Sequence, residues 1–180
     1  KRAVKEALEK KGYDTKEFEP NRILGAISRE KGNFVTAGEY NGGGDYFGEI
    51  IAEVWQEYEQ ILKKENALDF DDLLLVSAKL LEKEEIRKIY SEKWKYVHVD
   101  EYQDTNKVQY HIAKALSMHG NICAVGDIDQ NIYSWRGANI RNILNFERDY
   151  PSAKMVVLEE NYRSTQTILA VANRAIEKNK

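Results

Sequence analysis

The amino-acid sequence predicts an α/β fold in which a parallel sheet is flanked by helices and preceded by an all-helical part. In residues 1–65 the apolar residues recur at helical spacing. After residue 65, short β-prone stretches alternate with longer helical patterns, which is typical of a parallel sheet covered on both faces. Two of these stretches run directly into acidic residues, at the strand ends where open parallel sheets bind ligands.

The first part is expected to contain three helices and a loop. Pro20 suits the start of the second helix, because its missing N–H is not needed there. The loop, at residues 32–44, is rich in glycine and asparagine. The third helix is long and amphipathic, with apolar residues at i, i+3 and i+4. The expected helices are Lys1–Gly12, Asn21–Glu30 and Tyr46–Glu65.

The second part is expected to alternate helices with three strands. Ser164 is the expected N-cap of the last helix. His98 and Cys123 lie within strands, so both are expected to be packed core residues. The expected strands are Tyr96–Val99, Ile122–Val125 and Met155–Leu158. The expected helices are Asp69–Leu81 continuing through Glu82–Tyr90, Asn106–Met118, Ile140–Asp149 and Thr165–Glu177.

Two clusters resemble binding sites but favour structural roles. Asp69, Asp71 and Asp72 stand at the positive end of an expected helix, where a solvated or N-capping role is more common than metal binding. Gly42–Gly44 lacks the following Lys and Ser/Thr of a phosphate-binding loop, so it is expected to be a flexible surface turn.

Composition excludes several classes of protein. The 180 residues carry 27 Lys+Arg and 30 Asp+Glu, a net charge of −3, so no strongly basic nucleic-acid binder is indicated. The single cysteine excludes an internal disulfide framework and a cysteine-rich zinc site, and it favours a reduced, intracellular setting. No apolar run approaches the roughly 18 residues of a membrane span, so no membrane partner is expected.

Asp100 and Glu101 follow the first expected strand in the pattern of a Walker B motif. An aspartate here places a hard oxygen where Mg²⁺ sits beside nucleotide phosphates. The adjacent glutamate can polarise a water for attack on the γ-phosphate. The alternative is that both carboxylates simply cap the following helix.

Four blocks of sequence, in order, resemble motifs of the UvrD/PcrA/Rep-like superfamily 1 DNA helicases. Ala67–Leu74 resembles a family block, Asp100–Thr105 motif II, Val125–Ala138 motif III, and Leu158–Thr165 motif IV. The resemblance covers essentially the whole chain and implies a partial RecA-like P-loop NTPase motor domain with a helical insertion. The implied divisions are 1–65 for the insertion subdomain, 66–158 for the later half of the first motor domain, and 159–180 for motif IV and the start of the second.

The resemblance also implies roles for residues of a nucleotide site that uses ATP and Mg²⁺. Asp100 would bind Mg²⁺ and Glu101 would be the catalytic base. Gln130 would sense the γ-phosphate. Arg163 would contact that phosphate as an arginine finger, and Tyr162 would stack near the adenine. Taken alone, Arg163 would be read as a surface salt-bridge residue.

Tyr133, Trp135 and Arg136 are implied to meet single-stranded DNA. An exposed indole can stack on a base without reading sequence. Tyr133 lies two residues before Trp135, so an extended segment would place both rings on one side. Taken alone, Trp135 would be read as a core residue, but the aromatic pair followed by Arg136 favours a DNA-tracking site.

The expected function is that of an ATP-dependent 3′–5′ DNA helicase that couples ATP hydrolysis to translocation on single-stranded DNA and to duplex unwinding. Expected partners are single-stranded DNA, single-strand/duplex junctions and repair or replication proteins, in the cytoplasm on the nucleoid. No segment matches G-x-x-x-x-G-K-[ST], so the chain is expected to be an internal, inactive piece that lacks the Walker A loop and motifs V and VI. The alternatives are a non-catalytic DNA- or partner-binding module and part of a helicase–nuclease fusion.

Overall fold

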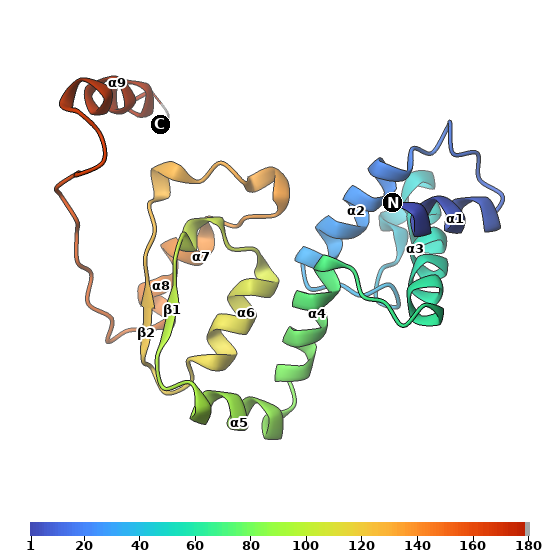
Figure 1. The fold of residues 1–180 in the computed structure, drawn as a ribbon, viewed down its shortest axis with the longest axis horizontal. Coiled ribbons are helices and arrows are strands. Elements are labelled where there is room, and N and C mark those ends of the chain that lie inside the picture. The colour runs from blue at the N-terminus through green and yellow to red at the C-terminus, as the bar shows by residue number, and fades with distance from the viewer. Residues whose placement is uncertain (179–180) are drawn as a thin grey trace.

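The computed structural model describes residues 1–178, except the Arg136 side chain, as helices and a small parallel sheet (Figure 1). The helices are α1 (Arg2–Lys10), α2 (Pro20–Gly32), α3 (Tyr46–Lys64), α4 (Phe70–Leu81), α5 (Glu84–Lys93), α6 (Lys107–Leu116), α7 (Arg141–Leu144), α8 (Phe146–Asp149) and α9 (Gln166–Ile176). The strands are β1 (Val97–Val99) and β2 (Ile122–Ala124). Helices α1, α2 and α3 gather at one end, and α4 leads from them towards α6 and the sheet.

The helical unit, formed by α1, α2 and α3, has its own apolar core. Its helices match those expected in residues 1–65 to within two residues at each end. Their apolar stripes face one another, as the periodicity predicts. The buried core residues are Val4, Ala7, Leu8, Phe18, Ile23, Ile27, Ile50, Ile51, Val54, Trp55, Tyr58, Ile61 and Leu62.

The Gly42–Gly44 run forms a short 3₁₀ turn ahead of α3. All three glycines have positive φ, which other residues rarely adopt. Gly42 is buried against Gly48, whereas Gly43 and Gly44 are exposed. The expected surface position is therefore confirmed for Gly43 and Gly44 and wrong for Gly42.

A second, smaller core lies between α4 and α6. Its buried members are Leu75, Ala78 and Val108. Phe34, from the loop after α2, packs against them with a positive φ of 70°. The core therefore joins the helical unit to the part of the chain that carries the sheet.

The sheet consists of β1 and β2 in parallel, which confirms the expected pairing type. His98 pairs with Cys123 in the register, and both side chains are exposed. The expectation that they are core residues is wrong. Successive strand residues point to opposite faces, and the described helices leave the face of His98 and Cys123 open to solvent.

The strand expected at Met155–Leu158 is absent from the described structure. These four apolar residues form an exposed segment without strand pairing, because no described strand lies alongside to complete a ladder. Ser164 is not the N-cap of α9. Thr165 occupies that position without a side-chain bond, and the Ser164 N–H donates to Asn161 Oδ1 at 2.8 Å.

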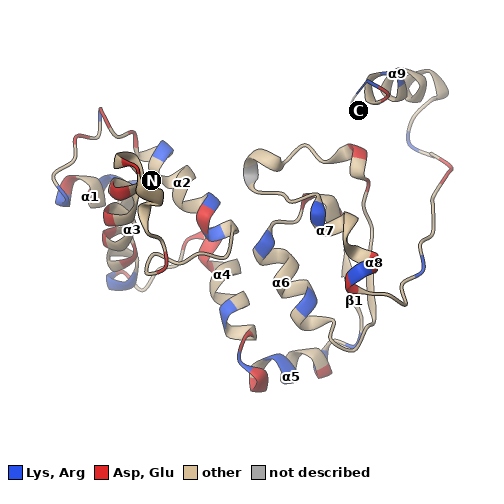
Figure 2. Cartoon of the chain, turned by 180° about the vertical axis from the view of Figure 1, so that it is seen from behind, with Lys and Arg blue, Asp and Glu red and all other residues tan. Residues whose placement is uncertain are grey.

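Two helices expected to be continuous are broken. A turn at Glu82–Lys83 separates α4 from α5, and Asn145 separates α7 from α8. Within residues 1–178, no helix is both long enough and apolar enough to cross a membrane. Figure 2 shows acidic and basic residues interspersed along α1, whereas α3 carries acidic residues along its length and lysines only in its last turn.

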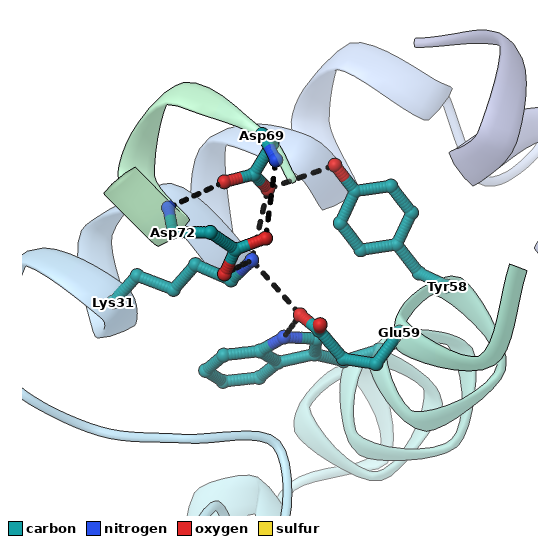
Figure 3. Close-up of polar contacts among 6 residues, drawn as sticks. Lys31, Tyr58, Glu59, Asp69 and Asp72 are labelled. Carbon is teal, nitrogen blue, oxygen red and sulfur yellow. Dashed lines mark hydrogen bonds and ion pairs between the residues drawn. The ribbon is translucent and has the colours of Figure 1, made fainter. Parts of the chain in front are cut away.

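A buried ion cluster joins α2, α3 and α4 (Figure 3). The Lys31 ammonium is 1% exposed and donates to Asp72 Oδ1 at 2.6 Å, to Asp69 Oδ2 at 2.8 Å and to Glu59 Oε1 at 2.8 Å. The Tyr58 hydroxyl donates to Asp69 Oδ2 at 2.8 Å, and Trp55 Nε1 donates to Glu59 Oε1 at 2.8 Å. We call these residues the Lys31 cluster.

Asp69 and Asp72 also start α4. The Asp69 side chain accepts the Asp72 N–H at 2.7 Å, and the Asp72 side chain accepts the Asp69 N–H at 3.1 Å, which makes a reciprocal capping box. The expected N-capping role is confirmed for Asp69. The expected solvated face is wrong for Asp72, which is buried, because both carboxylates turn inward to Lys31.

The charges of the Lys31 cluster stabilise one another. Burial lowers the pKa of Lys31, but hydrogen bonds to Asp69, Asp72 and Glu59 outweigh it and raise that pKa above its usual range. Burial raises the pKa of Asp69, but the bond from Lys31 outweighs it and the pKa is lowered. Both groups therefore stay charged at neutral pH.

Replacing Lys31 by Met is expected to lower the free energy of unfolding by about 3–5 kcal/mol, because it leaves three carboxylates without their buried cation. Urea unfolding followed by tryptophan fluorescence measures the change.

The matched control is Lys88→Met on α5, whose side chain is 74% exposed and lies 4.0 Å from Glu92. This exposed pair should contribute less than about 1 kcal/mol. Equal losses in the two variants would contradict a structural role for the Lys31 cluster.

Candidate active site

The ends of β1 and β2 form one polar edge. β1 runs into Asp100 and Glu101, and β2 runs through Val125 and Gly126 into Asp127. The Val125 N–H donates to the Val99 carbonyl at 2.8 Å, and the Tyr102 N–H donates to the Val125 carbonyl at 2.9 Å. These bonds continue the contact between the two chain segments past the strands, so the acidic residues emerge side by side.

Gln103 bridges the two acidic segments. Its side chain is 1% exposed; Nε2 donates to Glu101 Oε2 at 2.7 Å, and Oε1 accepts the Asp127 N–H at 3.0 Å. The Gln103 carbonyl also accepts from Asn131 Nδ2 at 2.6 Å. One buried amide therefore sets the position of Glu101 relative to the loop that follows β2.

Glu101 has a left-handed backbone conformation, with φ 49° and ψ 45°. Such a conformation is costly for a residue other than glycine and persists where surrounding contacts impose it. The Glu101 N–H donates to Asp100 Oδ1 at 2.9 Å, and both side chains are exposed. The strained turn thus presents two adjacent carboxylates to solvent at the strand end.

The alternative that Asp100 and Glu101 cap the next helix is wrong. Helix α6 is capped by Asn106, whose side chain accepts the Gln109 N–H at 2.9 Å. The Gln109 side chain in turn accepts the Asn106 N–H at 2.9 Å. The Asn-x-x-Gln spacing signalled this capping box, so the sequence could have excluded the alternative.

Buried side chains hold the loop between the carboxylates and α6 in place. Tyr102 is buried, with its ring 5.5 Å from that of Phe146. The Thr105 hydroxyl donates to the Tyr102 carbonyl at 2.7 Å. Buried Asn142, on α7, donates through Nδ2 to the Thr105 carbonyl at 3.0 Å and to Thr105 Oγ1 at 3.1 Å. Sequence reasoning missed Gln103, Thr105 and Asn142, because the contacts of Gln103 with Asp127 and of Asn142 with Thr105 join positions far apart in the chain.

The donor set at this edge suits Mg²⁺ only together with phosphates and water. Among residues 1–178, no three His, Cys, Asp or Glu side chains gather closely enough to hold a metal. Mg²⁺ is often bound by one or two carboxylates plus substrate phosphates. Asp100 can supply such an exposed carboxylate. Asp127 is engaged in its own loop, where its oxygens accept from the Asp129 N–H and from Gln130 Nε2.

Gln130 lies on the same edge as the carboxylates. Its Nε2 donates to Asp127 Oδ2 at 2.8 Å, and the Asp127 backbone is held by Gln103. The side chain is exposed. A short chain of hydrogen bonds therefore connects Gln130 to Glu101.

Tyr133 and Trp135 form an exposed aromatic pair. Their ring centroids are 6.4 Å apart, and the Trp135 side chain is 72% exposed, so the reading of Trp135 as a core residue is wrong. The segment is a 3₁₀ turn rather than the extended chain that we expected. The side chain of Arg136 lies outside the described structure.

Tyr162 and Arg163 are not brought to this edge. They lie in the exposed segment that leads away from the sheet to α9 (Figure 1). The Arg163 N–H donates to Asn161 Oδ1 at 2.9 Å, and the Tyr162 hydroxyl donates to Glu160 Oε2 at 2.5 Å. Arg163 has no ion pair with any described residue, so the structure does not place it in a salt bridge either.

Comparison with known proteins identifies relatives for the whole chain. A family model described as the UvrD/REP helicase N-terminal domain matches residues 1–151. The ATP-dependent DNA helicase PcrA of Staphylococcus aureus (strain Mu50) is 47% identical over 182 residues, covering 99% of this chain and 25% of the relative. PcrA of Bacillus subtilis (strain 168) is 45% identical over 179 residues, covering 98% and 24%. The chain thus spans about a quarter of the length of these relatives.

Replacing Gly126 by Ala is expected to destabilise the fold by about 1–3 kcal/mol, because the new methyl group would lie 2.5 Å from Gln103 Oε1 and 2.9 Å from Ile143 Cδ1. Urea unfolding gives the energy, and the NMR shift of the Gln103 side-chain amide reports whether the bridge moves.

Gly25→Ala is the matched control. Gly25 lies inside α2 with nothing within 4 Å of a built Cβ, so alanine should stabilise the chain by about 0.5–1 kcal/mol. A shift of stability in the same direction for both variants would contradict the close packing of Gly126 against Gln103 and Ile143.

Proposed function

Because the chain belongs to the UvrD/REP helicase family, we propose that it forms part of an ATP-dependent DNA helicase in which Asp100 and Glu101 carry the nucleotide chemistry. The observation that carries this proposal is the Gln103 bridge. It positions Glu101 against the loop after β2 at the strand ends, where open parallel sheets bind ligands.

In the proposed site, Asp100 would hold the Mg²⁺ that accompanies ATP, and Glu101 would accept a proton from the water that attacks the γ-phosphate as the bond to ADP breaks. The Mg²⁺ neutralises charge on the phosphates. Glu101 is suited to its role because its carboxylate is exposed while Oε2 is oriented by Gln103. Gln130 is proposed to contact the γ-phosphate. A movement of Gln130 would then reach Gln103 through the hydrogen bonds of Asp127.

Arg163 is proposed to stabilise the γ-phosphate during transfer, and Tyr162 to stack near the adenine. Both side chains are exposed, and their segment leads away from the sheet to α9 (Figure 1). The proposal therefore requires the segment after residue 151 to approach Asp100 when nucleotide binds. An arginine brought in this way offsets the charge that develops in the transition state.

Tyr133, Trp135 and Arg136 are proposed to bind single-stranded DNA. The exposed ring pair offers faces on which bases stack without sequence preference. The pair follows Gln130 closely in sequence, which supports coupling between DNA binding and the nucleotide site. Movement from 3′ to 5′, action at single-strand/duplex junctions and contacts with repair or replication proteins belong to the same proposal, on the basis of the family resemblance.

The proposed domain division places an inserted helical subdomain at 1–65, part of a RecA-like motor domain at 66–158 and the start of a second motor domain at 159–180. The separate apolar cores of the helical unit and of α4 with α6 support the first boundary. The exposed segment after α8 supports the second. The 180-residue chain alone is proposed to lack ATP turnover, because its sequence contains no G-x-x-x-x-G-K-[ST] loop.

Replacing Glu101 by Gln in a complete helicase that carries this chain is expected to lower DNA-stimulated ATP hydrolysis by about 10²–10⁴-fold, because the general base is lost. Gln retains an oxygen that can accept from Gln103, so the local geometry survives. Phosphate release is measured with single-stranded DNA present, and binding of a fluorescent ATP analogue should persist.

Glu92→Gln, an exposed carboxylate on α5, is the matched control and should hydrolyse ATP at the wild-type rate. Unchanged turnover in Glu101→Gln would show that Glu101 is not the base. Turnover by the isolated 180-residue chain would refute the proposed inactivity.

Replacing Trp135 by Ala is expected to weaken binding of single-stranded DNA by about 1–3 kcal/mol, the contribution of one stacked base. Fluorescence anisotropy with a labelled oligothymidine measures the affinity. Trp94→Ala is the control, since Trp94 is also partly exposed but stacks on Tyr90. Equal losses of affinity in the two variants would show that Trp135 is not part of the DNA site.

A further inference from the structure

The Lys31 cluster joins the helical unit to the start of α4, and we propose that Lys31 is a positioning residue for Asp100 and Glu101. The inference rests on the proposed function, in which these carboxylates meet ATP. Lys31 contacts neither of them, so its effect is indirect and, in this proposal, passes from the end of α2 to α6. Three sets of contacts trace that route.

The first contacts immobilise the end of α2. Lys31 is the last residue but one of this helix and is 1% exposed. Its three N–H groups are matched by three carboxylates, two at the start of α4 and one on α3 (Figure 3). The end of α2 cannot move relative to either helix without separating buried opposite charges, which is costly.

The second contacts run from the end of α2 to α6. Gly32 directly follows Lys31, and a Cβ built on it would lie 3.5 Å from Asn106 Nδ2. Phe34, in the left-handed backbone region, places its ring 4.8 Å from the ring of His111. The chain immediately after Lys31 therefore lies against both the first residue before α6 and a residue within it.

The third contacts connect the start of α6 to the carboxylates. Asn106 caps α6 and directly follows Thr105. The Thr105 hydroxyl bonds to the Tyr102 carbonyl, and Tyr102 follows Glu101. A shift of Asn106 therefore moves the strained turn at Glu101. Misplacement of a reacting group by about 1 Å can reduce a rate on the order of 100-fold.

The activity test compares Lys31→Met with wild type in a complete helicase that carries this chain, at a temperature where both proteins are folded. The expected result is that kcat for DNA-stimulated ATP hydrolysis falls about tenfold while KM for ATP stays within about twofold, because the carboxylates are displaced but the nucleotide still binds.

Ile27→Ala is the matched control. Ile27 is fully buried one turn earlier on α2, and its truncation destabilises the chain without touching the Lys31 cluster. It should leave kcat within about twofold of wild type. An equal fall of kcat in both variants, or no fall in Lys31→Met, overturns the proposal, because Lys31 would then act through stability alone or not at all.

Amide hydrogen exchange on the 180-residue chain tests the same idea without activity. The Tyr102 and Thr105 amides, which donate to the Val125 and Tyr102 carbonyls, should exchange about tenfold faster in Lys31→Met than in Ile27→Ala. Equal exchange at these amides in the two variants overturns the positioning role. If the wild-type helicase fails to hydrolyse ATP, the proposed function falls, but this exchange result still decides the role of Lys31.

Glu59→Gln replaces Lys31→Met if the latter does not fold. Glu59 is one-third exposed, and Gln keeps an acceptor for Lys31 and Trp55 while removing one charge. A smaller acceleration, confined to the same two amides, is expected. Unchanged exchange there in Glu59→Gln overturns the proposal.

Discussion

The three-way contact of Lys31 with Glu59, Asp69 and Asp72 is the constraint on which the arrangement of the chain depends. The carboxylates of Asp69 and Asp72 both cap the start of α4 and bind the Lys31 ammonium. The start of α4 is therefore joined to the end of α2 by buried ion pairs. A buried lysine is tolerated only when its donors are all matched. The ion pairs of Lys31 therefore set the orientation of α4 relative to the helical unit, and apolar side chains pack around them.

The candidate site depends on a second buried polar group, the amide of Gln103. Its two ends bind partners on opposite sides, the Glu101 carboxylate and the Asp127 backbone, so a single side chain joins the segments after β1 and β2. The left-handed turn at Glu101 is also stabilised by buried Thr105, which donates to the Tyr102 carbonyl and accepts from Asn142. Polar contacts on both sides of the turn explain how two exposed carboxylates can have a defined position.

Local patterns predicted most of the helices and the parallel pairing, and the predicted helicase family is confirmed by the comparisons. The wrong expectations about the sheet share one cause. His98, Cys123 and Met155–Leu158 have sequences suited to a covered sheet, but their burial depends on neighbouring elements that the described structure does not place over them. The Tyr133–Trp135 pair formed as expected, although through a turn rather than an extended segment.

By itself, the sequence determined which segments are helical, where the carboxylates follow a strand and which motifs resemble a helicase, because these properties depend on residues close together in the chain. Only the tertiary structure decided that Lys31 is buried among three carboxylates and that Gln103 joins two loops. It also showed that the segment carrying Tyr162 and Arg163 leads away from the sheet. Lys31 lies 41 positions before Asp72, and Gln103 lies 24 before Asp127. Contacts over such separations are set by packing, which no local pattern encodes.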